Sequence, residues 1–144
     1  EELMHMYYNS VGHNSTLIMG LTPDPRGLLP EADVKRLEQW GEAIEKTFSK
    51  PIATSAVKGK ELALPLNGSK IIQNIVIQED ISQGQRIRKY NIHGFTNGRW
   101  RVIAEGQSVG HKRIHRLEPI AVEQLRLEIQ ESTLPPIVSF FGVY

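Results

Sequence analysis

The first fifty residues combine helical periodicity with one short apolar run. Apolar residues fall at helical spacing in residues 1–10 and again in residues 30–49, where a proline and two acidic residues begin the stretch and another proline follows it. Between them, residues 15–22 include a continuous apolar run, which is typical of a strand buried on both faces, although a run this short does not exclude helix. The order helix, strand, helix is the repeating unit of a parallel α/β fold.

A buried parallel strand cannot form alone, because its backbone groups need hydrogen-bonding neighbours on both sides. No second α/β unit follows in this chain. We therefore expect the partners of this strand in sequence that precedes residue 1 or in another chain. Without such partners residues 1–50 would expose apolar surface, so we expect the isolated chain to oligomerise through this segment or to pack it against its own remainder.

Residues 51–144 show the period of two that is typical of strands. About seven short alternating segments are separated by turns, and Thr96-Asn97-Gly98 is a strong hairpin signal. Beyond this hairpin Trp100 is in phase with Val102, which predicts that the indole lies in the core. The predicted fold is mainly β, a C-terminal jelly-roll β-sandwich in residues 51–144 preceded by the helix-strand-helix unit of residues 1–50.

The composition excludes several classes of function. The 144 residues carry a formal net charge of +1, which favours neither nucleic acid nor an anionic membrane as a partner. The chain has no cysteine, so disulfide scaffolds, cysteine-based zinc sites and thiol nucleophiles are excluded. No apolar run approaches the length of a membrane span.

The chain contains no strong catalytic constellation. Glu79 and Asp80 are adjacent, so on a strand they would face opposite sides and could not flank one bond; a solvated turn or a salt bridge to a following arginine is the simpler interpretation. His111 and His115 would share a face of a strand, but no third ligand accompanies them. We therefore predict no catalytic residue, no metal site and no cofactor in this chain.

Residues 6–48 resemble the end of the catalytic barrel in the α-L-fucosidases of glycoside hydrolase family 29. The resemblance is carried by Val11-Gly12-His13-Asn14, by the apolar run, by Pro-Asp and Gly before an acidic helix start, and by Gly41-Glu42-Ala43-Ile44. It implies that residues 15–22 are the last strand of a (β/α) barrel, that residues 1–10 are the helix before it, and that residues 30–49 are the helix that closes the ring.

The second part resembles the domain that follows the barrel in many such enzymes. The stretches IVIQEDISQGQRIRKYNI, GRWRVIAEGQSVGHKRI and LRLEIQES, before PPIVSFFGVY, are similar to a discoidin-like, galactose-binding-like β-sandwich. The resemblance therefore covers essentially the whole chain.

This resemblance implies the C-terminal part of a retaining enzyme that removes terminal α-L-fucose from glycans. In that family the catalytic carboxylates lie on earlier barrel strands, so we expect this chain to be inactive alone. The implied partners are the upstream catalytic barrel, a fucosylated glycan and, as a further option, a second copy of the chain. The implied location of the parent protein is secreted, periplasmic or lysosomal.

Two groups of residues are candidates for contact with sugar. The carboxyl ends of barrel strands face the active site, which would place Thr22 and Asp24 near its mouth, with turn formation as an equally simple interpretation. In the sandwich the candidates lie in residues 79–86 and 107–113. They are Glu79, Asp80, Gln85, Arg86, His111 and Arg113.

A purely structural brace is the simpler interpretation of the sandwich, because no aromatic residue obviously sits in those loops to stack on a sugar ring. Two alternatives remain open. One is a carbohydrate-binding module that functions without catalysis, and the other is a protein-interaction domain.

Overall fold

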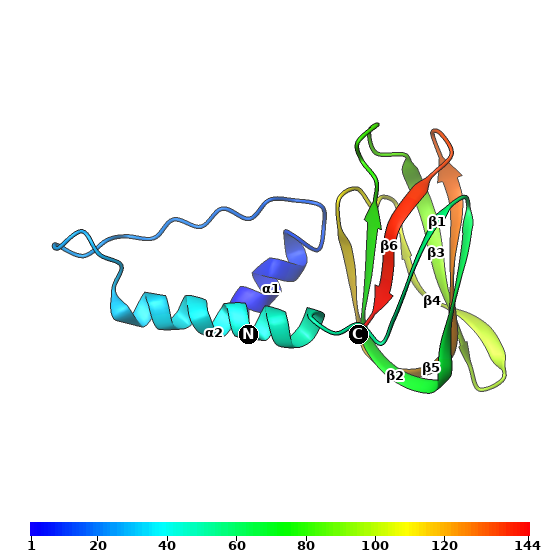
Figure 1. The fold of residues 1–144 in the computed structure, drawn as a ribbon, viewed down its shortest axis with the longest axis horizontal. Coiled ribbons are helices and arrows are strands. Elements are labelled where there is room, and N and C mark those ends of the chain that lie inside the picture. Colours follow the sequence, from blue (N-terminus) through cyan, green and yellow to red (C-terminus); the bar gives the residue numbers. More distant parts are fainter.

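In the computed structural model, which describes all of residues 1–144, a helical segment projects from a β-sandwich (Figure 1). The helices and strands are α1 (Glu2–Asn9), α2 (Glu31–Phe48), β1 (Ala53–Lys58), β2 (Glu61–Glu79), β3 (Ile87–Thr96), β4 (Arg99–Gly106), β5 (Arg113–Ser132) and β6 (Ile137–Val143). Neither helix combines the length and the apolarity needed to cross a lipid bilayer.

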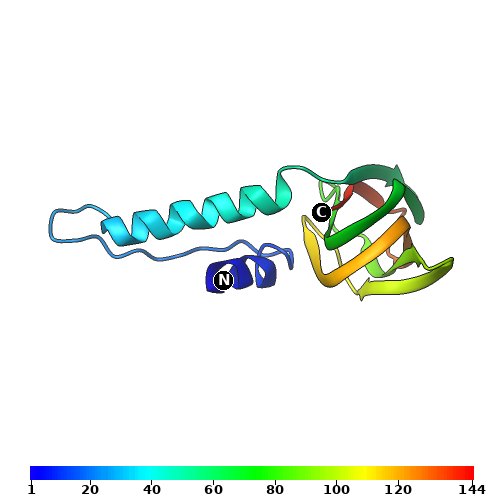
Figure 2. The same ribbon diagram turned by 90° about the horizontal axis from the view of Figure 1, so that it is seen from below.

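All strand pairs are antiparallel, and the hydrogen-bonded order is β1-β6-β2-β5-β3-β4. β2 and β5 are 19 and 20 residues long, and their pairing is interrupted by register shifts that let such strands bend. The strands therefore curl around a common interior (Figure 2). The predicted mainly β fold with a C-terminal sandwich is confirmed. The structure has six strands instead of about seven, because two of the predicted segments lie on the single bent strand β2.

The core is filled by alternate side chains of the long strands. Leu62, Leu64 and Leu66 of β2 are buried, as the alternating pattern predicts. β5 and β3 contribute in the same way, with Leu125, Leu127, Ile129, Tyr90 and Ile92. Because each fully buried aliphatic side chain contributes about 2 kcal/mol, this cluster is the main source of stability in the sandwich.

The predicted hairpin between β3 and β4 is confirmed, but the predicted face of β4 is wrong. Asn97 and Gly98 both have positive φ, 51° and 73°, as a tight two-residue hairpin requires. Further along, the β3–β4 register shifts by one residue, so that Val102 lies on the outer face and Ile103 packs against the core. Because a one-residue shift reverses the face, Trp100 also lies outside the core.

The predicted strand at residues 15–22 is wrong as a description of this chain. Both flanking helices form within the predicted ranges, but residues 15–22 have no strand assignment. Ile18 in the middle of the apolar run is 88% exposed. The segment runs extended beside α2, away from the sandwich (Figure 1). The physical reason is that a parallel strand needs neighbours on both sides, and none is present here.

The helical segment touches the sandwich at one end only. The Asn14 side-chain oxygen accepts a hydrogen bond from the backbone N–H of His111 at 2.6 Å. The rings of Phe48 and Tyr144 meet edge to face, with centroids 5.3 Å apart. The rest of α2 has no buried residue. The expected packing of residues 1–50 on the sandwich is therefore limited to this end, and oligomerisation stays a prediction.

A polar pair links β3 and β5 through the buried Tyr90 and the half-buried His115. The hydroxyl of Tyr90 is 2.7 Å from Nε2 of His115. Burial raises the pKa of Tyr90 to about 12. Burial, and then the charges of Arg113 and His13, lower the pKa of His115 to about 4. Gly106 leaves the space for this pair, because a Cβ there would lie 2.4 Å from the Tyr90 hydroxyl. At neutral pH both partners are uncharged, and a neutral hydrogen bond joins the hydroxyl to the imidazole.

This pair predicts a loss of stability in acid. The unfolded chain takes up a proton on His115 near the ordinary pKa of 6.5, whereas the folded chain takes it up only near 4. The contribution is therefore fully present above pH 6.5 and disappears as pH falls through about 4, with an upper size of roughly 3 kcal/mol. Urea unfolding at pH 7 and at pH 4 should show this loss, and His115→Gln should make it smaller.

His111→Gln, at an exposed position, is the matched control. It should leave the pH dependence of the free energy of unfolding unchanged. An identical acid loss in the His115 and His111 variants would contradict the assignment.

Candidate functional site

The two groups of candidate residues lie at different ends of the molecule. Thr22 and Asp24 lie just before the start of α2, and the sandwich follows its end (Figure 1). The 18 residues of α2 span roughly 27 Å at 1.5 Å per residue. One sugar ring could not contact both groups within this chain.

Asp24 is engaged within its own turn. Its carboxylate accepts hydrogen bonds from the backbone N–H groups of Arg26 and Leu28, at 2.9 and 3.2 Å. It also pairs with the Arg26 guanidinium at 2.7 Å, and this contact is the main cause of the lowered pKa of Asp24. Thr22 is exposed on the same loop. Turn formation accounts for Asp24, and sugar contact by this pair stays a prediction.

Glu79 ties together two loops at one end of the sandwich. Its side chain is buried, with only 3% of the residue exposed. Its carboxylate accepts hydrogen bonds from the backbone N–H groups of Arg86 at 2.7 Å, Ile87 at 3.0 Å and Gly110 at 3.3 Å. The expected solvated turn or arginine salt bridge is therefore wrong for this residue. Sequence could not show the difference, because the partners are backbone amides of two loops, and the second loop lies 31 residues further along the chain.

The other residues of the first loop are also held internally. Asp80 accepts the backbone N–H of Ser82 at 3.0 Å, and the hydrogen bonds from Ser82 are the main cause of its lowered pKa. Arg86 donates from its guanidinium to the carbonyl of Pro135 at 2.7 Å, which joins the loop to the segment before β6. Gln85, which precedes Arg86, is half-buried.

The second loop is covered by the N-terminal segment. Gly110 has a φ of 62°, and a Cβ there would lie 2.2 Å from the Asn14 side chain, so this contact requires glycine. The neighbouring His111 donates its backbone N–H to Asn14, and Arg113 is half-buried at the start of β5. His111 does not join His115, which is half-buried and forms a hydrogen bond with Tyr90.

The structure thus brings the sandwich candidates to one end of the sandwich, but it uses several of them as structural ties. No group of three or more His, Cys, Asp or Glu side chains is placed to hold a metal ion.

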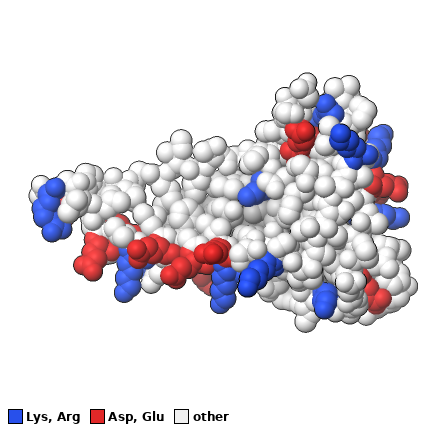
Figure 3. Space-filling view, in the orientation of Figure 1, with Lys and Arg blue, Asp and Glu red and all other residues white.

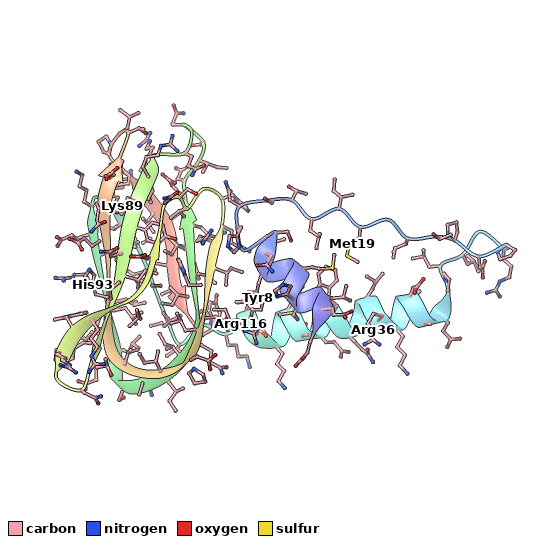
Figure 4. The ribbon with its side chains drawn as sticks, turned by 180° about the vertical axis from the view of Figure 1, so that it is seen from behind. Tyr8, Met19, Arg36, Lys89, His93 and Arg116 are labelled. Atoms are coloured by element: carbon pink, nitrogen blue, oxygen red, sulfur yellow. The ribbon has the colours of Figure 1, made fainter.

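A polar cleft that sequence reasoning missed lies where the helices meet the sandwich. It has a volume of about 580 Å³ and is lined by Tyr8, Asn74, Arg116 and Glu118 among others. The Arg116 guanidinium lies 5.4 Å from the centroid of the Tyr8 ring, and both side chains point into this junction (Figure 4). Burial raises the pKa of Tyr8 more than Arg116 lowers it. The contributing elements are α1, α2, β2 and β5, so no local sequence signal could have shown the cleft.

Proteins assigned as α-L-fucosidases match nearly the whole chain. The crystal structure of one such protein from Bacteroides thetaiotaomicron matches 99% of this chain with 45% identity and a TM-score of 0.96, and the match covers 33% of that protein. A Ruminococcus gnavus fucosidase of glycoside hydrolase family 29, solved with fucose, matches 99% of the chain with 26% identity and a TM-score of 0.87, over 36% of its own length. A rice protein assigned as α-L-fucosidase 1 is 27% identical over 99% of the chain and 34% of its own length. No family model matches the chain.

The sandwich alone has a second kind of neighbour. The family 32 carbohydrate-binding module of Clostridium perfringens NanJ, solved with galactose, matches 62% of the chain and 69% of the module with a TM-score of 0.51. At 22% identity this likeness shows the β-sandwich fold alone.

The resemblance to the C-terminal portion of family 29 α-L-fucosidases is therefore confirmed, and the comparisons support the assignment of this chain as a fucosidase C-terminal region. The chain spans about one third of the length of the relatives named here.

The three amide contacts of Glu79 predict a large cost for its removal. Glu79→Ala would leave three backbone N–H groups buried without acceptors, and we expect the free energy of unfolding to fall by about 3 kcal/mol. Glu79→Gln should also destabilise the fold, because its amide NH₂ cannot accept a backbone N–H. Urea unfolding measures both losses.

Glu61→Gln, on an exposed position of the same strand, is the matched control and should change little. Equal stability of the Glu79→Gln and Glu61→Gln proteins would show that the carboxylate does not tie the loops.

Proposed function

We propose that this chain is the C-terminal region of an α-L-fucosidase, that a catalytic barrel packs on its helical segment, and that the sandwich braces this barrel. The observation that carries the proposal is the uncovered apolar side of the helical segment. Relatives about three times as long as the chain supply an occupant for it.

The helical segment has a charged side and an apolar side. Acidic and basic residues line one side of α2, whereas the side toward the extended segment carries no charge in the same view (Figure 3). Exposed apolar side chains gather on the extended segment, the loop and the start of α2. They are Ile18, Leu21, Leu28, Leu29 and Val34. Exposed apolar patches of this kind mark contact surfaces.

The order of elements supports a barrel as the occupant. A helix, an extended segment and a second helix make up one unit of a (β/α) barrel, in which the extended segment pairs with strands on both sides. Residues 15–22 lack such partners here, so a neighbouring strand would supply both hydrogen bonds and cover for Ile18. In a barrel of this kind the Thr22–Asp24 loop would lie on the active-site face.

The candidate carboxylates in this chain are not free to catalyse hydrolysis. A retaining glycosidase needs a nucleophile and an acid/base about 5 Å apart. Asp24 is held by Arg26 within its turn, and Glu79 is buried against backbone amides. The preceding barrel would therefore supply both catalytic groups, and the chain alone would be inactive. The internal bonds of the sandwich loops favour bracing over sugar binding at that end.

The test compares the 144-residue chain with the longest polypeptide that its gene encodes, using an aryl α-L-fucoside as substrate. We expect hydrolysis by the longer protein and none by the chain. Ile18→Asp in the longer protein should lower the hydrolysis rate at least tenfold and destabilise the barrel, because it places a charge in the predicted interface.

Lys35→Asp, an exposed position of α2, is the matched control and should keep most of the activity. Three results would each overturn the proposal: hydrolysis by the chain alone, full activity of the Ile18→Asp protein, or a gene product with nothing before residue 1.

A further inference from the structure

The outer face of β3, β4 and β5 carries an aromatic and polar surface in regular rows. The strand registers place Gln124, Phe95 and Trp100 side by side across three strands. The next row along the same face contains Arg126, His93 and Val102. Adjacent strands lie about 4.8 Å apart, so each row spans roughly 10 Å. We call these six residues the Trp100 face.

The indole of Trp100 is both held in place and accessible. Phe95 contacts it edge to face with centroids 5.4 Å apart, and the Arg126 guanidinium lies 5.2 Å from the ring centroid. Trp100 is nevertheless 39% exposed, and its neighbour Val102 is 51% exposed. The face therefore presents a pre-positioned apolar plate to solvent, and a ligand that stacks on it would not have to order the ring first.

Hydrogen-bonding groups of both kinds flank this plate. Arg126 forms no ion pair or hydrogen bond with a protein group, and its Nε is buried without an acceptor. Beside it Glu128 pairs with Nε2 of His93 at 2.8 Å, and the Glu128 side chain keeps 38% of its exposure. A ligand beside the indole would therefore find a hydrogen-bond donor, Arg126, that has no protein acceptor, and an acceptor, Glu128, that is only partly engaged by His93.

These features fit a neutral ring that carries hydroxyl groups. The C–H side of such a ring can stack on the part of the indole that Arg126 leaves exposed. Its hydroxyls can accept a hydrogen bond from Arg126 and donate one to Glu128. Arg126 and Glu128 have opposite charge, so the face offers no net field to a nucleic acid or an anionic ligand. Glutamate is depleted at protein–protein interfaces, so the partly exposed Glu128 beside the indole makes a protein partner less suitable.

The Trp100 face would remain open if a domain packed on the helical segment. His93 lies on the side of the sandwich turned away from α1 and α2 (Figure 4). Residues 1–50, which carry the exposed apolar side chains, project from the opposite side of the sandwich (Figure 1). A surface that stays exposed in this way could contact an extended ligand in solution.

We propose that the Trp100 face binds a neutral oligosaccharide. This site is separate from the loops at residues 79–86 and 107–113, and it does not depend on the bracing function or on any hydrolysis. It also supplies the aromatic platform that those loops lack.

The chain has two tryptophans, so its fluorescence can isolate this site. In Trp40→Phe, Trp100 is the single indole, and its emission is followed during titration with three probes. The probes are a fucosylated lactose trisaccharide, lactose and a linear glucose oligosaccharide. We expect a saturable change with at least one of them.

Calorimetric titration of that probe then compares three variants. Trp100→Ala and Arg126→Gln should each bind about tenfold more weakly, equivalent to about 1.4 kcal/mol. The matched control is Arg101→Gln on the same strand as Trp100, where residue 101 pairs with Gly94 and points to the other side of β4. It should bind as the original chain does. Circular dichroism checks that each variant is folded, and Arg126→Gln, at a half-buried position on the outer face of β5, provides a second test if Trp100→Ala unfolds.

Three outcomes would overturn the proposal. They are the absence of a saturable change with every probe, unchanged affinity in both Trp100→Ala and Arg126→Gln, and a stronger response to a single-stranded oligodeoxynucleotide than to any sugar. A fourth variant, Arg86→Gln, tests the loops. Loss of binding in this variant alone would place the sugar at the loops and would be a fourth outcome that contradicts the Trp100 face as the site. Aryl fucoside hydrolysis is measured separately, so a failure of the proposed function would leave this result unaffected.

Discussion

An extended backbone needs neighbours with which it can form hydrogen bonds. This requirement divides the molecule into a part whose strands all have such neighbours and a part whose extended segment has none. In the sandwich every strand has at least one antiparallel partner, and the two long strands bend so that the sheet closes around its own core. In residues 15–22 the backbone is extended but no strand lies beside it. The apolar run Leu17-Ile18-Met19 therefore has no hydrogen-bonded neighbouring strand, and no other element packs over its central residue Ile18. The same physical requirement explains why one half folds on itself and why the other suits a larger assembly.

The contacts between the two parts are local and specific. Asn14 reaches the amide beside Gly110, and Phe48 packs on the last residue of the chain, Tyr144. Glu79 holds Gly110 from the inside of the same loop. A single loop of the sandwich is therefore fixed from both sides, which would transmit the position of the helical segment to the sandwich. A brace requires such a rigid joint, and this joint uses residues that the loops would otherwise offer to a ligand.

Much of the fold could be predicted from periodicity, and the exceptions have physical causes. The alternation of Leu62, Leu64 and Leu66 gave the buried face of β2 correctly, because the period of two is a local property. The face of Trp100 was predicted wrongly, because a bulge at Ile103 depends on pairing with β3. The role of Glu79 was missed because its partners are backbone amides of two separate loops. In each case the error arose from tertiary contacts that no short window of sequence contains.

Amide hydrogen exchange, resolved by segment, tests most directly whether residues 15–22 are a barrel strand that awaits its neighbours. In the 144-residue chain the account predicts slow exchange in β2 and β5 and fast exchange in residues 15–22, which have no ladder. In the longest polypeptide that the gene encodes, residues 15–22 should become as protected as the sandwich strands. Slow exchange of residues 15–22 in a monomeric 144-residue chain, or fast exchange in the longer protein, would contradict the account.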